Sequence, residues 1–401
     1  MRLVNHKNPR LVAAMVMVAI VVSLGTAFLF HILAATQAVA IEAEAGNITV
    51  SATTGNDTNA SGGRYVQFSG QSAVTPLPSP GAWTDVTSNL VGMSTDCGTV
   101  TSVYTVPGTN KVIAGLAKRG LWVSSNDGSS WTQMPGSTIF NHRPISIVFD
   151  PTNANIFWET GLYDPPGVNK TSDGGNTFQT LGDVEDLFSV TVDFSDPARQ
   201  RILAGARRRP QMVWKTTDGG KTWTNIGLNL PGGTGITTHP IFINATTFLV
   251  NTDPSSDGIG GVWRTTNGGT SWQQVSSLPP RNAPLVTANG TIYWSSTDGL
   301  AKSTDSGLTW KKVGSGLLDN FPPIELPDGR IVSSNGSNLV VSADGGSTWK
   351  SFGAAIPPTP NGASGFTNIS YSATTGAFYA AQFTCEAAPS PVRAGAVMRL
   401  H

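Results

Sequence analysis

Short apolar runs recur along the chain from about residue 81 onward, and each has the length of a β-strand. Runs such as GLWV, MVWK, GVWR and NLVV are rich in β-branched and aromatic residues, which favour strands. A shorter alternating run follows each of them, as in WTQM, WTNIG and WKKV. Polar, glycine-rich segments separate the two runs of each pair. The pattern predicts a series of antiparallel β-hairpins.

One eight-residue segment forms the predicted turn of these hairpins, and we call it the octet. It occurs six times, as SSNDGSSW (124–131), TSDGGNTF (171–178), TTDGGKTW (216–223), TTNGGTSW (265–272), STDSGLTW (303–310) and SADGGSTW (342–349). The final aromatic residues follow one another at steps of 47, 45, 49, 38 and 39 residues. A repeat of this period is typical of one four-stranded propeller blade.

The recurring residues of the octet have a structural explanation. Ser or Thr at the first position and Asp or Asn at the third can accept hydrogen bonds from nearby backbone N–H groups, while Gly at the fifth allows positive φ. The final aromatic side chain returns to the core between neighbouring blades. We therefore expect structural roles for the third and eighth positions, which are Asn126, Asp173, Asp218, Asn267, Asp305 and Asp344, and Trp131, Phe178, Trp223, Trp272, Trp310 and Trp349.

The consensus S/T-x-D/N-x-G-x-S/T-W/F resembles the Asp-box, or bacterial neuraminidase repeat. This repeat occurs in sialidase-like propellers, sortilin-type receptors, xyloglucan-degrading hydrolases and a photosystem II assembly factor. The resemblance implies an all-β propeller. It implies little about function, because the repeat is structural in enzymes and binding proteins alike.

The number of blades follows from the strands that lack an octet. GAWTDVT (81–87) resembles the strand after an octet but has none before it, and TNISYSAT, AFYAAQF and GAVMRL supply three strands with none after them. We predict a seven-bladed propeller of four-stranded antiparallel blades over residues 81–401, its last blade built from both chain ends. Cys97 and Cys385 fall in this composite region and favour a disulfide that locks the ring. Two buried free thiols are the alternative.

The N-terminal forty residues have the pattern of an export signal. Residues 11–30 carry no charge, and Arg2, Lys7 and Arg10 precede them. The positive-inside rule then places the body of the protein outside the membrane. Ala38-Val39-Ala40 suits signal peptidase, yet the apolar run is long enough to span a bilayer. We expect 1–40 to be a signal peptide or a signal anchor, so the protein is secreted or held at the cell surface by residues 11–36.

A short segment precedes the propeller. Residues 41–70 resemble the first strands of a carbohydrate-binding β-sandwich module, but a complete module needs roughly 100 residues. We expect a β-hairpin stalk at 41–70, followed by the linker at 71–80.

Composition excludes some partners. Only 12% of the residues are charged, and Lys+Arg and Asp+Glu are equal at 25 each, so nothing favours nucleic acid. The five histidines show no metal-ligand spacing, and the octets lack the calcium-loop pattern. We expect a monomer with no metal and no cofactor.

Candidate ligand contacts lie opposite the octets, on the face where second-to-third-strand loops and blade connections open. Long loops on a rigid scaffold often bind ligands. ETGLYDPPG (159–167) and GARRRPQ (205–211) are two of these loops. The ligand-binding candidates are Trp158, Glu159, Tyr163, Arg143, Arg207 and Arg281, and the weak catalytic candidates are Glu159, Glu185 and Asp186.

Three functions fit this sequence. The first is an exported, non-catalytic propeller that binds a glycan or another extracellular ligand. The second is an exo-acting, sialidase-like glycoside hydrolase, which requires an arginine triad, a Tyr–Glu pair and an Asp acid. The third is an adhesion or assembly module that binds protein. We expect a binding protein rather than an enzyme, because the sialidase Phe-Arg-Ile-Pro signature is absent.

Overall fold

The computed structural model divides the chain into two units, Met1–Val74 and Thr75–His401. The predicted signal segment 1–40 and the linker 71–80 lie outside the residues that it describes. No helix among the described residues is long and apolar enough to cross a membrane. The described residues are 52–56, 64–68, 81–91, 93, 100–139, 143–163, 167–207, 209–254, 258–297, 299–317, 321–358, 366, 368–383 and 395–401.

The first unit contains a two-stranded antiparallel hairpin. Strand β1 (Ala52–Asn56) pairs with β2 (Arg64–Phe68), and Ala52 lies opposite Phe68. This hairpin falls within the predicted stalk at 41–70.

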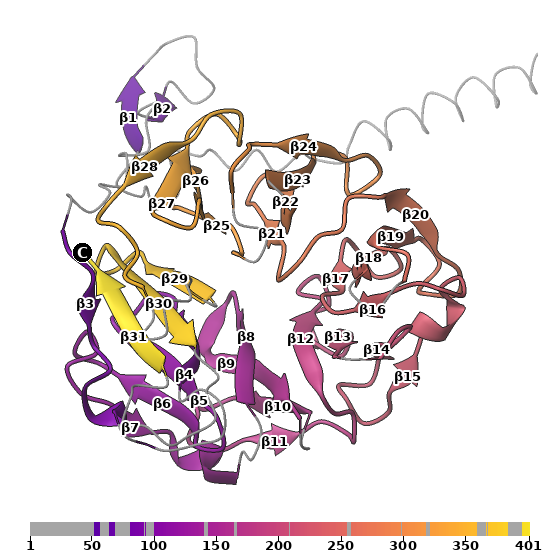
Figure 1. Cartoon of the computed structure of the whole chain (residues 1–401), viewed down its shortest axis with the longest axis horizontal. Helices are drawn as coiled ribbons and strands as arrows, with labels where there is room; N and C mark the ends of the chain where they lie inside the picture. Colours follow the sequence, from indigo (N-terminus) through magenta and orange to yellow (C-terminus); the bar gives the residue numbers. More distant parts are fainter. Residues whose placement is uncertain are drawn as a thin grey trace, which may run out of the picture. The chain divides into compact units, whose positions relative to one another are not determined.

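The second unit is a ring of seven antiparallel sheets, which Figure 1 shows in sequence order from purple through magenta and orange to yellow. Three short 3₁₀ turns accompany them, η3 (Ser88–Leu90), η4 (Pro135–Ile139) and η5 (Gly227–Asn229). Blade 1 consists of β4 (Val100–Thr105), β5 (Val112–Leu116), β6 (Gly120–Ser124) and β7 (Thr132–Gln133). Blade 2 consists of β8 (Arg143–Asp150), β9 (Asn153–Leu162), β10 (Val168–Thr171) and β11 (Gln179–Thr180). Blade 3 consists of β12 (Leu187–Val192), β13 (Ile202–Ala206), β14 (Val213–Thr216) and β15 (Thr224–Asn225).

The remaining blades follow the same order. Blades 4 to 7 consist of β16 (Ile236–Thr237), β17 (Ile241–Phe242), β18 (Phe248–Asp253), β19 (Gly261–Thr265) and β20 (Gln273–Ser276); β21 (Leu285–Val286), β22 (Ile292–Ser296), β23 (Gly299–Ser303) and β24 (Lys311–Val313); β25 (Ile324–Glu325), β26 (Ile331–Ser334), β27 (Leu339–Ser342) and β28 (Lys350–Phe352); and β29 (Asn368–Ser372), β30 (Ala377–Phe383), β31 (Gly395–Leu400) and β3 (Thr84–Asp85).

Blade 4 has a broken inner strand. Both β16 and β17 pair with β18, and His239-Pro240 lies between them. Proline has no N–H group to donate to a neighbouring strand, which explains the interruption. The break places His239 at the inner edge of the blade.

Both chain ends build the last blade, as predicted. Strand β3 pairs with β31, with Thr84 opposite Arg399. The ladder continues beyond β3, because the Val86 N–H donates to the Val397 carbonyl at 2.9 Å and the Val397 N–H donates to Thr87 Oγ1 at 3.0 Å. The seven-bladed prediction is confirmed.

The predicted disulfide partners Cys97 and Cys385 lie outside the described residues. Described residues that are close to these cysteines in the sequence lie together where the ring closes. Gly395 pairs with Phe383 across β30 and β31, and a Cβ placed on Gly395 would lie 3.1 Å from the Val100 nitrogen. The disulfide stays a prediction.

Side-chain hydrogen bonds hold each octet turn. In the third blade, the Thr216 hydroxyl donates to Asp218 Oδ1 at 2.7 Å and accepts from the Gly220 N–H at 3.0 Å. The Asp218 carboxylate also accepts from Thr222, from the N–H at 3.0 Å and from the hydroxyl at 2.6 Å. These hydrogen bonds hold the pKa of Asp218 well below its usual range. The aspartate therefore has a structural role.

The octet also joins neighbouring blades. The Trp223 indole donates to the Leu181 carbonyl of the preceding blade at 2.9 Å, and Trp131 and Trp272 make the same bond to Val86 and Ile226. Gly220 has φ +90°, and a Cβ there would lie 2.5 Å from the Leu181 side chain. Glycine is required here for both conformation and close approach.

Apolar side chains from adjacent sheets form the core between blades. Trp158 and Leu181 of blade 2 pack with Leu187 and Ile202 of blade 3. Tyr379 of blade 7 likewise belongs to an apolar cluster that includes residues of blade 1. Each blade therefore depends on its neighbours for a complete core.

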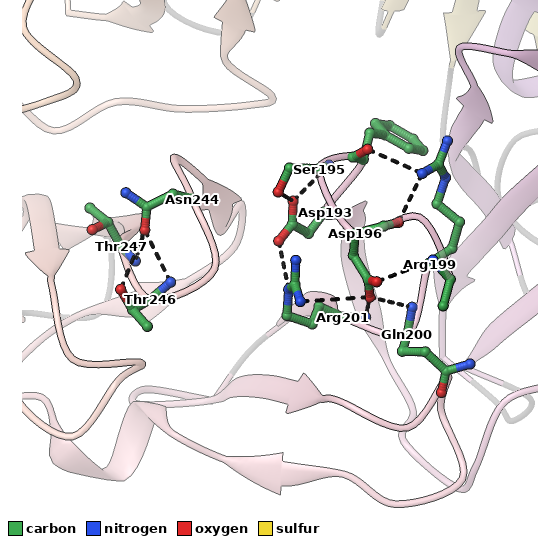
Figure 2. Close-up of polar contacts among 11 residues, drawn as sticks. Asp193, Ser195, Asp196, Arg199, Gln200, Arg201, Asn244, Thr246 and Thr247 are labelled. Carbon is green, nitrogen blue, oxygen red and sulfur yellow. Dashed lines mark hydrogen bonds and ion pairs between the residues drawn. The ribbon is translucent and has the colours of Figure 1, made fainter. Parts of the chain in front are cut away.

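Charged side chains stabilise the turn between β12 and β13, on the same face as the octets. Figure 2 shows Arg201 donating to Asp193 at 2.7 Å, while the Asp196 carboxylate accepts from the Gln200 N–H at 2.8 Å. Arg199 of this turn donates to Asp150 of blade 2 at 2.8 Å. The turn therefore ties blade 3 to blade 2.

We expect replacement of Asp218 by Ala to destabilise the propeller more than replacement by Asn. Asn267 occupies the equivalent position in blade 4, where its oxygen accepts from the Ser271 N–H at 3.0 Å and its amide donates to the Ser271 hydroxyl at 2.9 Å. Asn can thus keep the backbone bond, while Ala removes every acceptor. Thermal unfolding of the two variants at pH 7 tests this. Equal melting temperatures for Asp218→Ala and Asp218→Asn would contradict the structural role.

Candidate functional site

A cavity of about 310 Å³ lies at the centre of the ring. All seven blades contribute to it, mostly through residues at or near the starts of their innermost strands. Those starts lie opposite the octets, because an octet follows the end of each third strand and adjacent strands are antiparallel. The lining residues are Thr101, Tyr104, Arg143, Ile145, Leu162, Phe188, His239, Asn282, Ala283, Pro322 and Asn368.

We call this central cavity the channel cavity. Several of its polar side chains form hydrogen bonds with the protein backbone. The Tyr104 hydroxyl donates to the Ile145 carbonyl at 2.7 Å, and burial raises the pKa of Tyr104 to about 12. The Asn368 amide bonds both backbone groups of Val103, at 2.9 and 2.6 Å. These side chains join blades 7, 1 and 2 around the channel.

His239 lines the cavity at the break in blade 4. The backbone N–H of His239 donates to Asn251 Oδ1 at 2.8 Å, and the ring Nδ1 lies 2.8 Å from the Thr238 hydroxyl. The ring centroids of His239 and Phe188 are 6.1 Å apart. Burial lowers the pKa of His239 to about 3, so the imidazole is neutral at pH 7. A neutral imidazole can offer a ligand one donor or one acceptor, but no charge.

A second concavity, which we call the groove, has a volume of about 440 Å³ and lies between blades 2 and 3. It is on the same face as the channel cavity, because its residues come from the end of β9, the connection between β11 and β12, and the segment between β13 and β14. The lining residues are Tyr163, Asp183, Val184, Glu185, Asp186, Ala206, Arg207, Arg209, Met212 and Trp214.

Tyr163 lies between two arginines. The Cζ atoms of Arg143 and Arg207 are 4.7 and 4.4 Å from its ring centroid, distances that allow cation–π attraction. The Tyr163 N–H donates to Asp186 Oδ1 at 2.9 Å, and the Asp186 carbonyl accepts from the Arg207 N–H at 2.8 Å. Tyr163 and Asp186 both have positive φ, +80° and +51°. Such strained positions are frequent at ligand sites.

The structure corrects the expected places of Trp158 and Glu159. Strand β9 continues to Leu162, so both residues lie inside it, and both side chains are 0% exposed. Trp158 packs against Phe194, with ring centroids 6.2 Å apart. Glu159 accepts a hydrogen bond from the Asn169 amide at 3.0 Å. Neither side chain offers a surface to a ligand in this conformation.

The other candidates divide between the two concavities. Arg143 lines the channel cavity, and Arg207, Glu185 and Asp186 line the groove. Arg281 is exposed and lines neither, although the next residue, Asn282, lines the channel cavity.

Sequence reasoning did not single out Phe188 or Trp214. Trp214 lies within the predicted strand MVWK, where alternate side chains face opposite ways, and the pattern alone did not show whether it borders a concavity. Among the described residues, no group of three or more His, Cys, Asp or Glu side chains is placed to hold a metal ion.

Comparison with known proteins concerns the fold of this chain. No protein-family model matches the sequence, and no curated protein matches it. A structure of YCF48 bound to D1 peptide is 15% identical, with 81% of this chain and 99% of that chain covered and a TM-score of 0.50. The extracellular domain of a B. thetaiotaomicron hybrid two-component system is 12% identical, with 75% and 39% covered and a TM-score of 0.53.

A third similar structure is the GH74 xyloglucanase from Xanthomonas campestris. It is 18% identical, with 78% of this chain covered and a TM-score of 0.47, and the chain spans 55% of its length. At these identities the likeness concerns the fold alone. The fold is a seven-bladed β-propeller.

We expect His239 to make the propeller acid-sensitive. The pKa of His239 is lower in the folded protein than the usual 6.5, so the unfolded state binds one more proton as pH falls from 6.5 toward 3. The free energy of unfolding should therefore fall by about 1.4 kcal/mol per pH unit within that range because of this residue. Urea unfolding at pH 7, 5.5 and 4.5 should show a steeper loss for the wild type than for His239→Gln. Parallel losses would contradict the assignment.

Proposed function

We propose that this protein is a non-catalytic glycan-binding propeller whose ligand occupies the groove and the adjoining channel cavity. The observation that carries the proposal is the composition of the groove. Partly exposed aromatic rings, Tyr163 and Trp214, border it together with the exposed carboxylates of Asp183 and Glu185. Carboxylates accept hydrogen bonds from hydroxyl groups, and the Trp214 ring, unlike Tyr163, is stacked by no arginine among the described residues and can pack against C–H surfaces. A sugar ring offers both.

A hydrolase is less well supported. Glycosidases use two carboxyl groups that face one ligand, about 5 to 9.5 Å apart. Glu159 is buried, and none of the described residues lining the channel cavity is Asp or Glu. A catalytic pair would therefore have to come from the groove, where Asp186 already accepts from the Tyr163 N–H. Arg143 and Arg207 flank Tyr163, but Arg281 lines neither concavity, so these candidates do not form an arginine triad.

A protein partner is also less well supported. Large exposed apolar side chains come from separate segments of the ring, so they do not support one docking patch. Those within the described ranges are Val91, Leu228, Ile259, Val286 and Leu308.

The remaining sequence predictions belong to the same proposal. We propose that residues 1–40 export the protein and that the octets are Asp-box repeats, supported by their common turn hydrogen bonds. We also propose that Cys97 and Cys385 form a disulfide in the oxidising compartment that export implies. The closeness of the described residues Val100, Gly395 and Phe383 supports this pairing.

A glycan array with the full chain, run beside a fluorogenic glycoside panel, tests the function. We expect binding without turnover, and we expect Glu185→Gln to weaken binding about tenfold because it removes a charged acceptor from the groove. Asp173→Asn is the matched control, since Asp173 lies in an octet on the opposite face, where Asn occurs naturally in two other copies. Hydrolysis that Glu185→Gln abolishes, or equal binding by both variants, would overturn the proposal.

A further inference from the structure

We infer that the groove contains a subsite for an acidic sugar, with Arg207 binding the carboxylate of a hexuronate residue. This inference rests on the proposed glycan binding and narrows it to one class of glycan.

Arg207 has no acidic partner among the described residues, in contrast to three other partly buried arginines of the propeller. Arg199 and Arg201 form ion pairs with aspartates at 2.8 and 2.7 Å, and Arg330 does so at 2.8 Å. The Arg207 guanidinium forms no ion pair or hydrogen bond with any residue that the structure describes, and its Nη1 is shielded from solvent without an acceptor. Arg207 thus places a guanidinium without a bonded acceptor at the wall of the groove.

The position of Arg207 is fixed before a ligand arrives. Its guanidinium packs over the Tyr163 ring at 4.4 Å, and the backbone N–H of Arg207 donates to the Asp186 carbonyl at 2.8 Å. The Asp186 carboxylate is bound to the Tyr163 N–H and so holds the neighbouring ring in place. A planar guanidinium held in this way suits a carboxylate, which can accept two parallel N–H bonds.

The rest of the groove restricts what can carry that carboxylate. Asp183 and Glu185 are exposed, and a carboxylate accepts hydrogen bonds, so these two side chains favour a ligand with hydroxyl or other donor groups. A hexuronate ring combines one carboxylate with several hydroxyls, whereas a neutral hexose leaves Arg207 without an acceptor.

Calorimetric titration of the full chain with a trigalacturonate and with its carboxyl-reduced, neutral counterpart tests the inference. We expect the wild type to bind the acidic trimer at least tenfold more tightly. Arg207→Lys keeps the charge but loses the paired N–H geometry, so it should remove most of this preference. Arg119→Lys is the control, because Arg119 is an exposed arginine between β5 and β6 of blade 1. Thermal unfolding verifies that both variants fold.

The possible outcomes separate the inference from the proposed function. An unchanged preference in Arg207→Lys would overturn the uronate subsite. Tighter binding of a sulfated derivative of the carboxyl-reduced trimer than of the trigalacturonate would also overturn it. Wild-type binding of both uncharged and acidic trimers with equal affinity would overturn it while leaving glycan binding intact. Binding of no glycan on the array or in the titration would overturn the proposed function and the subsite with it.

Discussion

The pairing of β3 with β31 is the interaction on which the rest of this propeller depends. Each blade shares its core with its neighbours, so an open row of blades would leave one apolar face uncovered at each end. Val86 connects two parts of the closure. Its N–H bonds Val397 of the last blade, and its carbonyl accepts from the Trp131 indole of the first. One backbone segment therefore closes the sheet and receives the first octet.

Ring closure also positions the candidate site. The innermost strands converge around the axis, and the residues near their starts form the channel cavity. The octet turns, whose side chains are occupied with internal hydrogen bonds, lie on the other face. On the cavity side, Arg207 lacks an acidic partner within the described structure, and it borders the groove.

The sequence was sufficient to predict the number of blades and their closure, because the octet repeats at a regular period and its residues serve local hydrogen bonds. It was less reliable for the site. Glu159 was expected at the start of a loop and Trp158 just before it, but β9 extends past both residues and buries them. The stacking of Arg207 on Tyr163 depends on two segments more than 40 residues apart, which no local pattern reveals. The break in blade 4 is explained by Pro240 only once its neighbours are known.

The most direct measurement of ring closure compares urea unfolding of two shortened chains, one beginning at Thr75 and the other at Ser88. The first retains β3, Val86 and Thr87, and the second removes them. We expect one cooperative transition for the chain from Thr75 and a clearly lower midpoint for the chain from Ser88, because blade 7 would then lose its outermost strand and the Val86 contact with blade 1. Equal midpoints and slopes would show that the pairing of β3 with β31 does not hold the ring together.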